Sequence, residues 1–264
     1  MPFKERFTMR ASSITILCML IVLISTLITV TAMAQKKDEH IIWSQSIVNR
    51  YSLKMSIKHN NQWSTPELIE ESDKLIIVPT LSVKHDGDIY AAWTELNGDQ
   101  GRIRYKIKRN GAWESSQEMM TATSSDMAPA IVIDTFGIPW IVWSGTAKTG
   151  DDIYFSRWIG NQWQPPKRVN NNDEWPDILP SITVDNRKRI TVTWLGYNGE
   201  RYVKYSCYWT GNNWSQESVI GEIPPETFNS DKVLPDFIPE GSHGSLCSGE
   251  SKLIRKFVKT APTR

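Results

Sequence analysis

The sequence predicts an all-β protein, a β-propeller whose blades are four-stranded antiparallel sheets, on three observations. Tryptophans recur at a step of about 50 residues, prolines recur at the same step, and apolar residues between them alternate with the period of β-strands. A propeller repeats one four-stranded unit around an axis, whereas a β-sandwich does not repeat such a unit at a fixed step. The number of units predicts four blades, or part of a larger ring.

Two series of tryptophans define the repeat, with steps of 50, 50 and 51 residues in each series. The first series is Trp43, Trp93, Trp143 and Trp194, and the second, 20 residues further on, is Trp63, Trp113, Trp163 and Trp214. We expect these eight side chains to be structural, because a ring at one fixed place in every blade buries a large apolar area between blades. Stacking against sugar rings is the alternative role.

Each unit is expected to contain four strands. A proline opens the first strand at Pro79, Pro129 and Pro180, and a tryptophan of the first series closes the second strand. The third and fourth strands flank a two-residue turn such as Asn110-Gly111, because Asn and Gly tolerate positive φ best. The segment that recurs before each tryptophan of the second series, such as "IKRNGAW" ending at Trp113, is therefore a hairpin, and we expect no catalysis in it.

The repeat also sets the expected boundaries. Repeats are predicted at 41–70, 79–120, 129–170 and 180–221, after a linker at 35–40. The first unit lacks a proline-led strand, and "SDKVLPDFIPEG" parallels "SSDMAPAIVID", so a strand at about 231–239 is expected to close the four blades. Residues 241–264 fit no repeat and are expected to form a solvated or loosely docked tail. A larger ring, or one completed by pairing of chains, is the alternative.

One unit departs from the pattern. The apolar residues of its third strand, such as Val203 and Tyr205, are displaced by one position relative to Ile103 and Tyr105 in the second unit. The 51-residue step suggests a one-residue insertion in the loop before that strand. Such a slip would exchange the two faces of the strand unless a bulge absorbs it.

The N-terminal residues have the layout of a secretory signal peptide. Basic residues come first, an uncharged apolar run spans 14–31, and Ala32-Met33-Ala34 forms a small-x-small cleavage site. We therefore predict a signal peptide at 1–34 and a secreted or extracytoplasmic protein. The apolar run is longer than usual, so an uncleaved membrane anchor with the domain outside is the alternative.

Composition excludes several classes of function. Thirty Lys and Arg against 29 Asp and Glu give a net charge of +1, so we expect no nucleic-acid partner, and membrane contact only through an uncleaved N-terminal segment. The sequence has no phosphate-binding loop, no HExxH and no CxxC, and its four histidines are scattered, so we expect no cofactor and no metal. Cys207 and Cys247 are expected to be a buried thiol and a tail thiol, with a disulfide as the alternative.

A family resemblance rests on the run from Pro129 to Trp143, which contains Asp134 and Gly137. This run resembles the repeats of sialidase-like propellers, which carry the Asp-box turn S-x-D-x-G-x-x-W. It departs from that motif because Asp134 and Gly137 are separated by two residues and Val132 replaces the serine. The repeat style spans about 41–239 and is also similar to that of propeller lectins. The resemblance implies the fold, and no catalytic position of the family is carried over.

Candidate binding residues gather on one face of such a fold, where the loops between blades meet the loops that follow the second strands. These residues are Asp73, Asp126, Asp177, Trp175, Arg102 and Arg201. The acids precede the first strands and can bind a cation or a sugar hydroxyl, or cap the turn by bonding to backbone N–H groups. Trp175 lies outside the repeat among acids and amides, so it is the stronger candidate for sugar stacking.

The predicted function is an exported binding module for carbohydrate or for a cell-surface or extracellular partner. The alternatives are a sialidase-like glycoside hydrolase and a degenerate propeller scaffold without a small-molecule site. A hydrolase needs two suitably placed carboxylates or a tyrosine nucleophile, and no such set is marked in the sequence. Binding predicts that Trp175→Ala and Asp126→Ala weaken ligand capture and leave the fold intact.

Overall fold

A computed structural model describes residues 38–121, 123–148, 150–171, 173–222, 235, 237–239, 242–248 and 252–258. The chain divides into two units, Met1–Lys37 and Asp38–Arg264. The predicted signal peptide and the first part of the predicted linker lie outside the described residues, and everything below concerns the second unit. Within the described ranges, every regular element is a β-strand, and no helix is long and apolar enough to cross a membrane.

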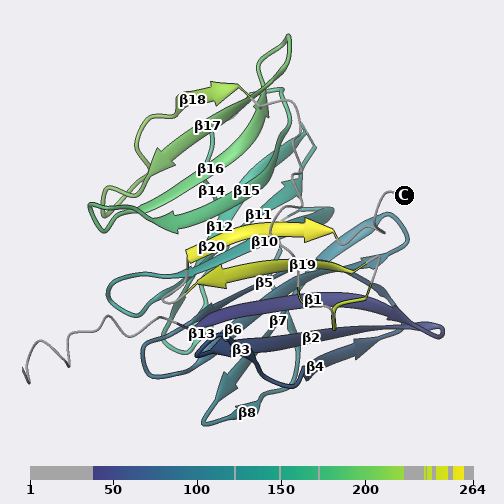
Figure 1. Cartoon of the computed structure of the whole chain (residues 1–264). Coiled ribbons are helices and arrows are strands. Elements are labelled where there is room, and N and C mark those ends of the chain that lie inside the picture. The colour runs from purple at the N-terminus through teal and green to yellow at the C-terminus, as the bar shows by residue number, and fades with distance from the viewer. Residues whose placement is uncertain are drawn as a thin grey trace, which may run out of the picture. The chain divides into compact units, whose positions relative to one another are not determined.

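Three of the four sheets follow one plan, in which the first three strands pair antiparallel in chain order and the short strands that follow pair with the third (Figure 1). The second sheet contains β5 (Leu75–Val83), β6 (Ile89–Asn97), β7 (Gln100–Arg109), β8 (Ala112–Trp113) and β9 (Gln117–Glu118). The third contains β10 (Ser125–Ile133), β11 (Pro139–Thr146), β12 (Asp151–Ile159), β13 (Gln162–Trp163) and β14 (Lys167–Arg168). The fourth contains β15 (Asp177–Val184), β16 (Ile190–Tyr197), β17 (Tyr202–Tyr208) and β18 (Ser218–Glu222). The prediction of four-stranded propeller blades is confirmed.

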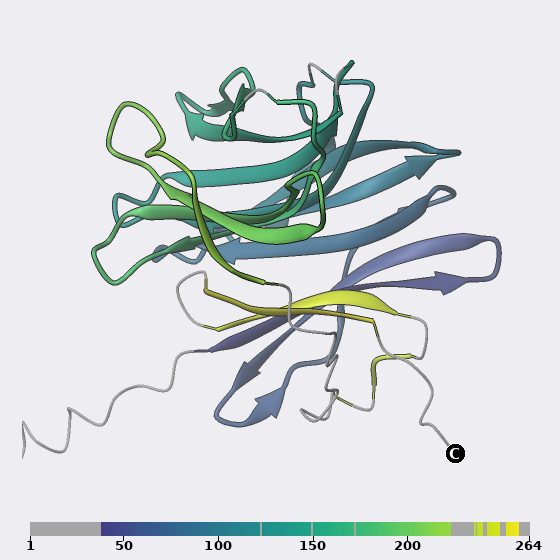
Figure 2. The ribbon, with the colours of Figure 1, turned by 90° about the horizontal axis from the view of Figure 1, so that it is seen from above.

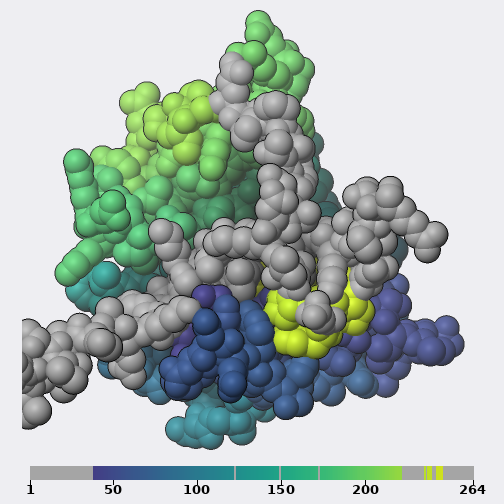
Figure 3. Space-filling model, viewed as in Figure 1, coloured from purple at the N-terminus to yellow at the C-terminus, as the bar shows by residue number. Residues whose placement is uncertain are grey.

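The first blade is built from both ends of the second unit. Its strands are β1 (Glu39–Ile47), β2 (Arg50–His59), β3 (Gln62–Trp63), β4 (Glu67–Ser72), β19 (His243–Ser248) and β20 (Lys252–Val258). β19 pairs antiparallel with β1, and β20 pairs with β19. In both ribbon views the yellow C-terminal strands lie beside the purple first blade (Figures 1 and 2), and in the space-filling view the yellow C-terminal residues lie against it (Figure 3).

The structure corrects the expected position of the strand that completes the first blade. β1 pairs with 243–248, which the sequence assigned to a loose tail, and not with 231–239. Residues 231–234 and 236 lie outside the described residues. The described part of the segment forms a turn in which the N–H of Ile238 donates to the carbonyl of Pro235. Prolines at 235 and 239 have no N–H to give to a ladder, which disfavours a paired strand there.

The segment instead covers the outer face of the first blade. Ile238 is buried against Ile41 and Trp43, and the ring of Phe237 lies 5.6 Å from that of Trp43 and 6.1 Å from that of Trp63. In the second and third blades, the tryptophans that correspond to Trp43 and Trp63 are covered by the preceding blade. Phe237 and Ile238 therefore bury apolar surface that would otherwise be exposed.

The repeat tryptophans pack between blades as expected. The first series, Trp43, Trp93, Trp143 and Trp194, is at most 1% exposed. Trp93 packs against Leu53 and Met55 of the preceding blade, and Trp143 packs against Ile103 and Tyr105 in the same way. The second series follows the hairpin turns, which have positive φ at Asn60, Asn61, Asn110, Gly111, Gly160, Asn161 and Gly211. The prediction that Asn and Gly turn the chain there is confirmed.

The irregular fourth blade contains no register slip. Trp143 pairs with Tyr154 and Trp194 pairs with Tyr205, so the number of residues between tryptophan and partner is unchanged. The extra residue therefore lies in the linker between blades, between Trp163 and the start of β15, and the predicted insertion in the loop before the third strand was wrong.

The displaced apolar pattern reverses which face of the strand is apolar. Buried Ile153 and Phe155 of the third blade have Lys204 and Ser206 as their counterparts in the fourth. Lys204 is exposed and Ser206 is half-buried, while Val203 and Cys207 on the opposite face are buried. A polar outer face suits the last unit of an array, because no further blade covers it. Cys207 is a free buried thiol, as expected, whereas the side chain of Cys247 lies outside the described residues.

Candidate functional site

Two of the predicted binding acids are buried partners of the repeat tryptophans. The indole Nε1–H of Trp143 donates to Oδ1 of Asp126 at 2.7 Å, and that of Trp194 donates to Oδ1 of Asp177 at 2.7 Å. Asp126 is 2% exposed and Asp177 is 7% exposed. Each bond fixes the start of a first strand to the end of the second strand in the same blade. Both carboxylates therefore serve the fold at the loop face without reaching solvent.

A β-bulge begins two residues after each of these acids and connects the strand to the preceding blade. Ala128 and Leu179 have φ of 54° and 53° where the first strands shift register. The N–H of Ala128 donates to Thr94 Oγ1 at 3.1 Å, and that of Leu179 donates to Ser144 Oγ at 3.0 Å. Both acceptors belong to the preceding blade, so the loop face is held together across the boundaries between blades.

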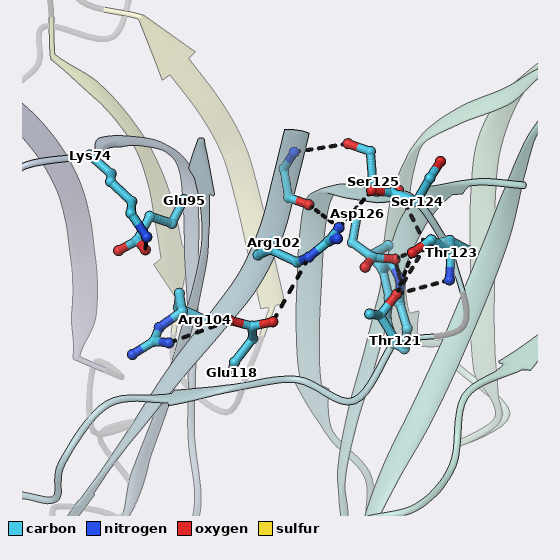
Figure 4. A network of polar contacts seen from close by, with 12 residues as sticks. Lys74, Glu95, Arg102, Arg104, Glu118, Thr121, Thr123, Ser124, Ser125 and Asp126 are labelled. Carbon is cyan, nitrogen blue, oxygen red and sulfur yellow. Dashed lines mark hydrogen bonds and ion pairs between the residues drawn. The ribbon is translucent and has the colours of Figure 1, made fainter. Parts of the chain in front are cut away.

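Figure 4 shows the surroundings of Asp126 and Arg102. The hydroxyl of Thr123 donates to the carboxylate of Asp126. The guanidinium of Arg102 donates to the carbonyl of Ser124 at 2.7 Å and lies 3.9 Å from Glu118. Arg102 from β7 thus ties the second blade to the linker that enters the third. Its N–H groups are engaged with the protein itself, which favours a structural role.

Asp73 does not share the position of the other two acids. Repeat steps of 50 and 51 place Ile76 as the counterpart of Asp126 and Asp177, and Ile76 is 1% exposed. The indole N–H of Trp93 accordingly has no hydrogen-bond partner among the described residues. Asp73 is exposed in the turn between β4 and β5. The three acids are therefore not a repeated set, because Asp73 lies three residues before the position that matches Asp126 and Asp177.

Replacing Asp126 is expected to cost stability instead of ligand capture. In Asp126→Ala the buried indole N–H of Trp143 loses its acceptor, which costs about 2–3 kcal/mol of unfolding free energy. Asp126→Asn keeps an acceptor oxygen and should cost about 1 kcal/mol. Urea unfolding followed by circular dichroism measures both. Normal stability together with lost ligand binding in Asp126→Ala would instead restore a binding role.

A second polar cluster links the third and fourth blades. The side-chain amide of Asn170 donates to Asp152 at 2.8 Å and to Asp177 at 2.6 Å, and Arg168 lies 3.3 Å from Asp152. Burial raises the pKa of Asp177 to about 7, and the nearby carboxylates of Asp173, Glu217 and Asp152 act in the same direction. Because both oxygens of Asp177 and of Asp152 accept hydrogen bonds from the protein, this cluster is a buried junction.

A row of partly exposed aromatic rings lies at the end of the fourth blade where this cluster is found. Trp175 is 45% exposed, and its ring lies 5.2 Å from that of Tyr197 in an edge-on arrangement. The ring of Tyr202, which is 36% exposed, lies 5.4 Å from that of Tyr197. We call Trp175, Tyr197 and Tyr202 the aromatic platform. Of the three, only Trp175 stands out in the sequence, since the tyrosines occupy ordinary strand positions.

Local backbone geometry holds the platform in place. The N–H of Trp175 donates to Oδ1 of Asp173 at 2.9 Å, an Asx turn in the linker between blades. Gly199 has φ of 93°, and a Cβ built there would lie 3.4 Å from Cζ2 of Trp175. A Cβ at that distance would only touch the indole, so the positive φ is what favours glycine at this position. In the same loop, the side-chain oxygen of Asn198 accepts the backbone N–H groups of Glu200 and Arg201.

The predicted site residues therefore separate into an exposed pair, three residues that hold the fold, and the isolated Asp73. Trp175 and Arg201 belong to the neighbouring linker and loop at the end of the fourth blade, and both are exposed. Asp126 is bonded within the third blade, Asp177 and Arg102 connect neighbouring blades, and Asp73 lies apart in the turn between β4 and β5. Within the described part of the chain, no group of three or more His, Cys, Asp or Glu side chains is arranged to hold a metal ion.

Comparisons with known proteins extend to the fold and no further. No protein-family model and no curated protein sequence matches the chain. A solved structure of a Dyadobacter fermentans protein of unknown function is similar, with a TM-score of 0.54 and 12% identity over 82% of this chain and 75% of that one.

Two carbohydrate-related structures are less similar. A fucose lectin from Kordia zhangzhouensis in complex with methyl-fucoside has a TM-score of 0.37 and 15% identity, over 55% of this chain and 99% of that one. The NanB sialidase from Streptococcus pneumoniae has a TM-score of 0.44 and 13% identity, over 68% of this chain and 28% of that one. The Dyadobacter structure, at 12% identity, is similar in fold alone, and the lectin and the sialidase, with TM-scores below 0.5, carry no further conclusion.

Proposed function

We propose that this protein is a carbohydrate-binding propeller whose binding surface is the aromatic platform of the fourth blade. The observation that carries the proposal is the exposed indole of Trp175 beside Tyr197 and Tyr202, within a loop region of amide, hydroxyl and charged groups. A sugar ring presents apolar C–H groups on one face and hydroxyls around its edge. It therefore suits a flat aromatic surface that is bordered by polar side chains.

Three features of the platform support recognition over simple packing. Trp175 lies outside the tryptophan repeat, so the blade does not need it for the contacts that the other blades make. Its indole packs edge-on against Tyr197, and the Asx turn at Asp173 fixes its backbone, which lowers the entropy lost on binding. Asn198 and Arg201 lie in the same loop, where side-chain groups can bond to hydroxyls.

Trp175→Ala is expected to weaken glycan capture at least tenfold and to change unfolding free energy by less than about 1 kcal/mol. The stacking surface is lost, whereas the exposed position contributes little to the core. Glycan capture by Trp175→Phe should lie between that of the wild type and that of Trp175→Ala. The measurement is retention of the chain from Gln35 on a broad glycan array that includes sialosides, with released sugar assayed in parallel.

A matched control is Phe136→Ala, which removes an aromatic side chain that is 87% exposed in the turn between β10 and β11. This turn lies at the opposite end of the strands from the linkers between blades, so capture should be unchanged. If both variants lose glycan capture equally, or if the wild-type chain is not retained, the protein would instead be a scaffold without a small-molecule site. Sugar release would favour the sialidase-like hydrolase.

Export of the protein is part of the same proposal. The support is the basic start, the apolar run and the Ala-Met-Ala site at 32–34. Sequencing the N-terminus of the protein recovered outside the cytoplasm tests it. A start at Gln35 means cleavage, an intact N-terminus in the membrane fraction means an anchor, and a cytoplasmic protein contradicts export.

A further inference from the structure

Arg157 on β12 departs from the repeat at a position that is otherwise apolar in the preceding blades. Its counterparts, 50 and 100 residues earlier, are Ile107 and Ile57. Ile107 is 2% exposed and packs between the second and third blades. A charged residue at a position that elsewhere packs between blades requires a physical reason.

Aromatic rings hold the guanidinium of Arg157 in place. It lies 4.9 Å from the ring centroid of Trp140 and 5.2 Å from that of Trp209, which belongs to the fourth blade. The two rings are themselves 5.4 Å apart. Stacking on tryptophan fixes the plane of a guanidinium and leaves its N–H edge available for other groups.

No acidic group of the described residues neutralises this cation. Arg157 makes no ion pair and no side-chain hydrogen bond there, and none of its nitrogens is among the buried atoms that lack a partner. Arg50, Arg104, Arg109, Arg168 and Arg189, by contrast, each pair with a carboxylate. The nearby carboxylate of Asp134 accepts hydrogen bonds from Phe136, Ile138 and the indole of Trp140. Within the described part of the chain, the guanidinium of Arg157 therefore has no carboxylate partner, and the side chain is partly exposed.

From this arrangement we propose that Arg157, with Trp140 and Trp209, binds the carboxylate of an acidic sugar. A planar guanidinium matches a carboxylate with two parallel N–H···O bonds, and neighbouring indole surface suits the sugar ring that bears it. Trp140 is almost fully buried, so Trp209, which is half-buried, supplies the accessible ring.

This second site is separate from the aromatic platform. Arg157 lies near the hairpin turn after Ile159, whereas Trp175 lies in a linker between blades at the other end of the strands. Binding at either site can therefore be tested independently of the other. Trp175→Ala should leave binding of an acidic sugar at Arg157 unchanged.

The experiment is calorimetric titration of the full chain, purified in a nonionic detergent, with trigalacturonic acid. We expect saturable binding that Arg157→Gln weakens at least tenfold and that Arg157→Lys weakens several-fold, because lysine keeps the charge but cannot form the planar pair of bonds. Arg187→Gln removes an exposed arginine from the turn between β15 and β16, and should leave binding unchanged. Urea midpoints show that each variant is folded, and Arg157→Lys serves if the glutamine variant does not fold.

Three results would overturn the assignment. One is no saturable binding of trigalacturonic acid by the wild-type chain, and another is equal binding by folded Arg157→Gln, which would make the arginine a packing residue. The third is inorganic sulfate that binds as tightly as the sugar acid and displaces it, because the site would then recognise charge without the sugar. Weak binding of sulfate together with tenfold dependence on Arg157 supports the proposal.

Discussion

A chain that ends at Pro239 is expected to lose its cooperative unfolding transition, or to unfold at a much lower urea concentration than the intact chain. The truncation removes β19 and β20. Six residues of β1, from Glu39 to Ser44, lose their cross-strand partners. At about 1 kcal/mol for each backbone hydrogen bond, together with newly exposed apolar surface of the first blade, the loss is about 5 kcal/mol or more. That is comparable to the whole stability of an ordinary domain.

The matching control is a chain that ends at Val258, which keeps both strands. Its urea midpoint should equal that of the intact chain, as followed by far-ultraviolet circular dichroism. If the chain ending at Pro239 unfolds at the same midpoint as the control, β19 does not support the first blade. An intermediate result, with a first transition of small amplitude, would mean that the first blade unfolds apart from the other three.

The free energy of unfolding is expected to fall as the pH rises from about 4 to about 7, because of Asp177. Its pKa is raised from 3.8 to about 7 by burial, so over this interval the folded protein keeps a proton that the unfolded chain has released. Stability falls with pH wherever the folded state binds more protons. At 1.36 kcal/mol for each unit, the fall is at most about 4 kcal/mol, and above pH 7 this contribution is constant.

Asp177→Asn isolates the effect, because asparagine does not titrate and still offers an oxygen to the indole of Trp194. We expect the difference in unfolding free energy between wild type and variant to change steadily between pH 4 and 7 and to be flat above pH 7. Urea unfolding at intervals of one pH unit measures it. A constant difference over the whole range would mean that Asp177 is ionised in the folded protein.

The tryptophan repeat determined the fold class, the hairpin turns and the packing role of the repeat tryptophans. Such features follow from local rules: strand periodicity at Leu81 and Val83, positive φ at Asn110 and Gly111, and a large ring at one place in every unit. Because every blade follows the same rules, each local pattern occurs three or four times in the chain and is therefore easy to recognise.

The pairing of strands that are distant in the sequence was decided by tertiary structure. β19 pairs with β1 across about 200 residues, and no local pattern in 243–248 distinguishes a closing strand from a tail. The segment 231–239 resembled the other first strands, yet its prolines favour a turn and its apolar residues Phe237 and Ile238 cover Trp43. Pairing of this kind depends on which edge is left open once the other strands are placed.

The candidate site divides in the same way. Trp175 was visible in the sequence because it breaks the repeat, and so was the row of acids near the first strands. Only packing showed that Asp126 and Asp177 turn inward to tryptophan indoles, and that Tyr197 and Tyr202 extend the surface of Trp175. The physical reason is that a polar residue near a strand end can face either solvent or a buried donor. The choice depends on neighbours that are up to tens of residues away in the chain.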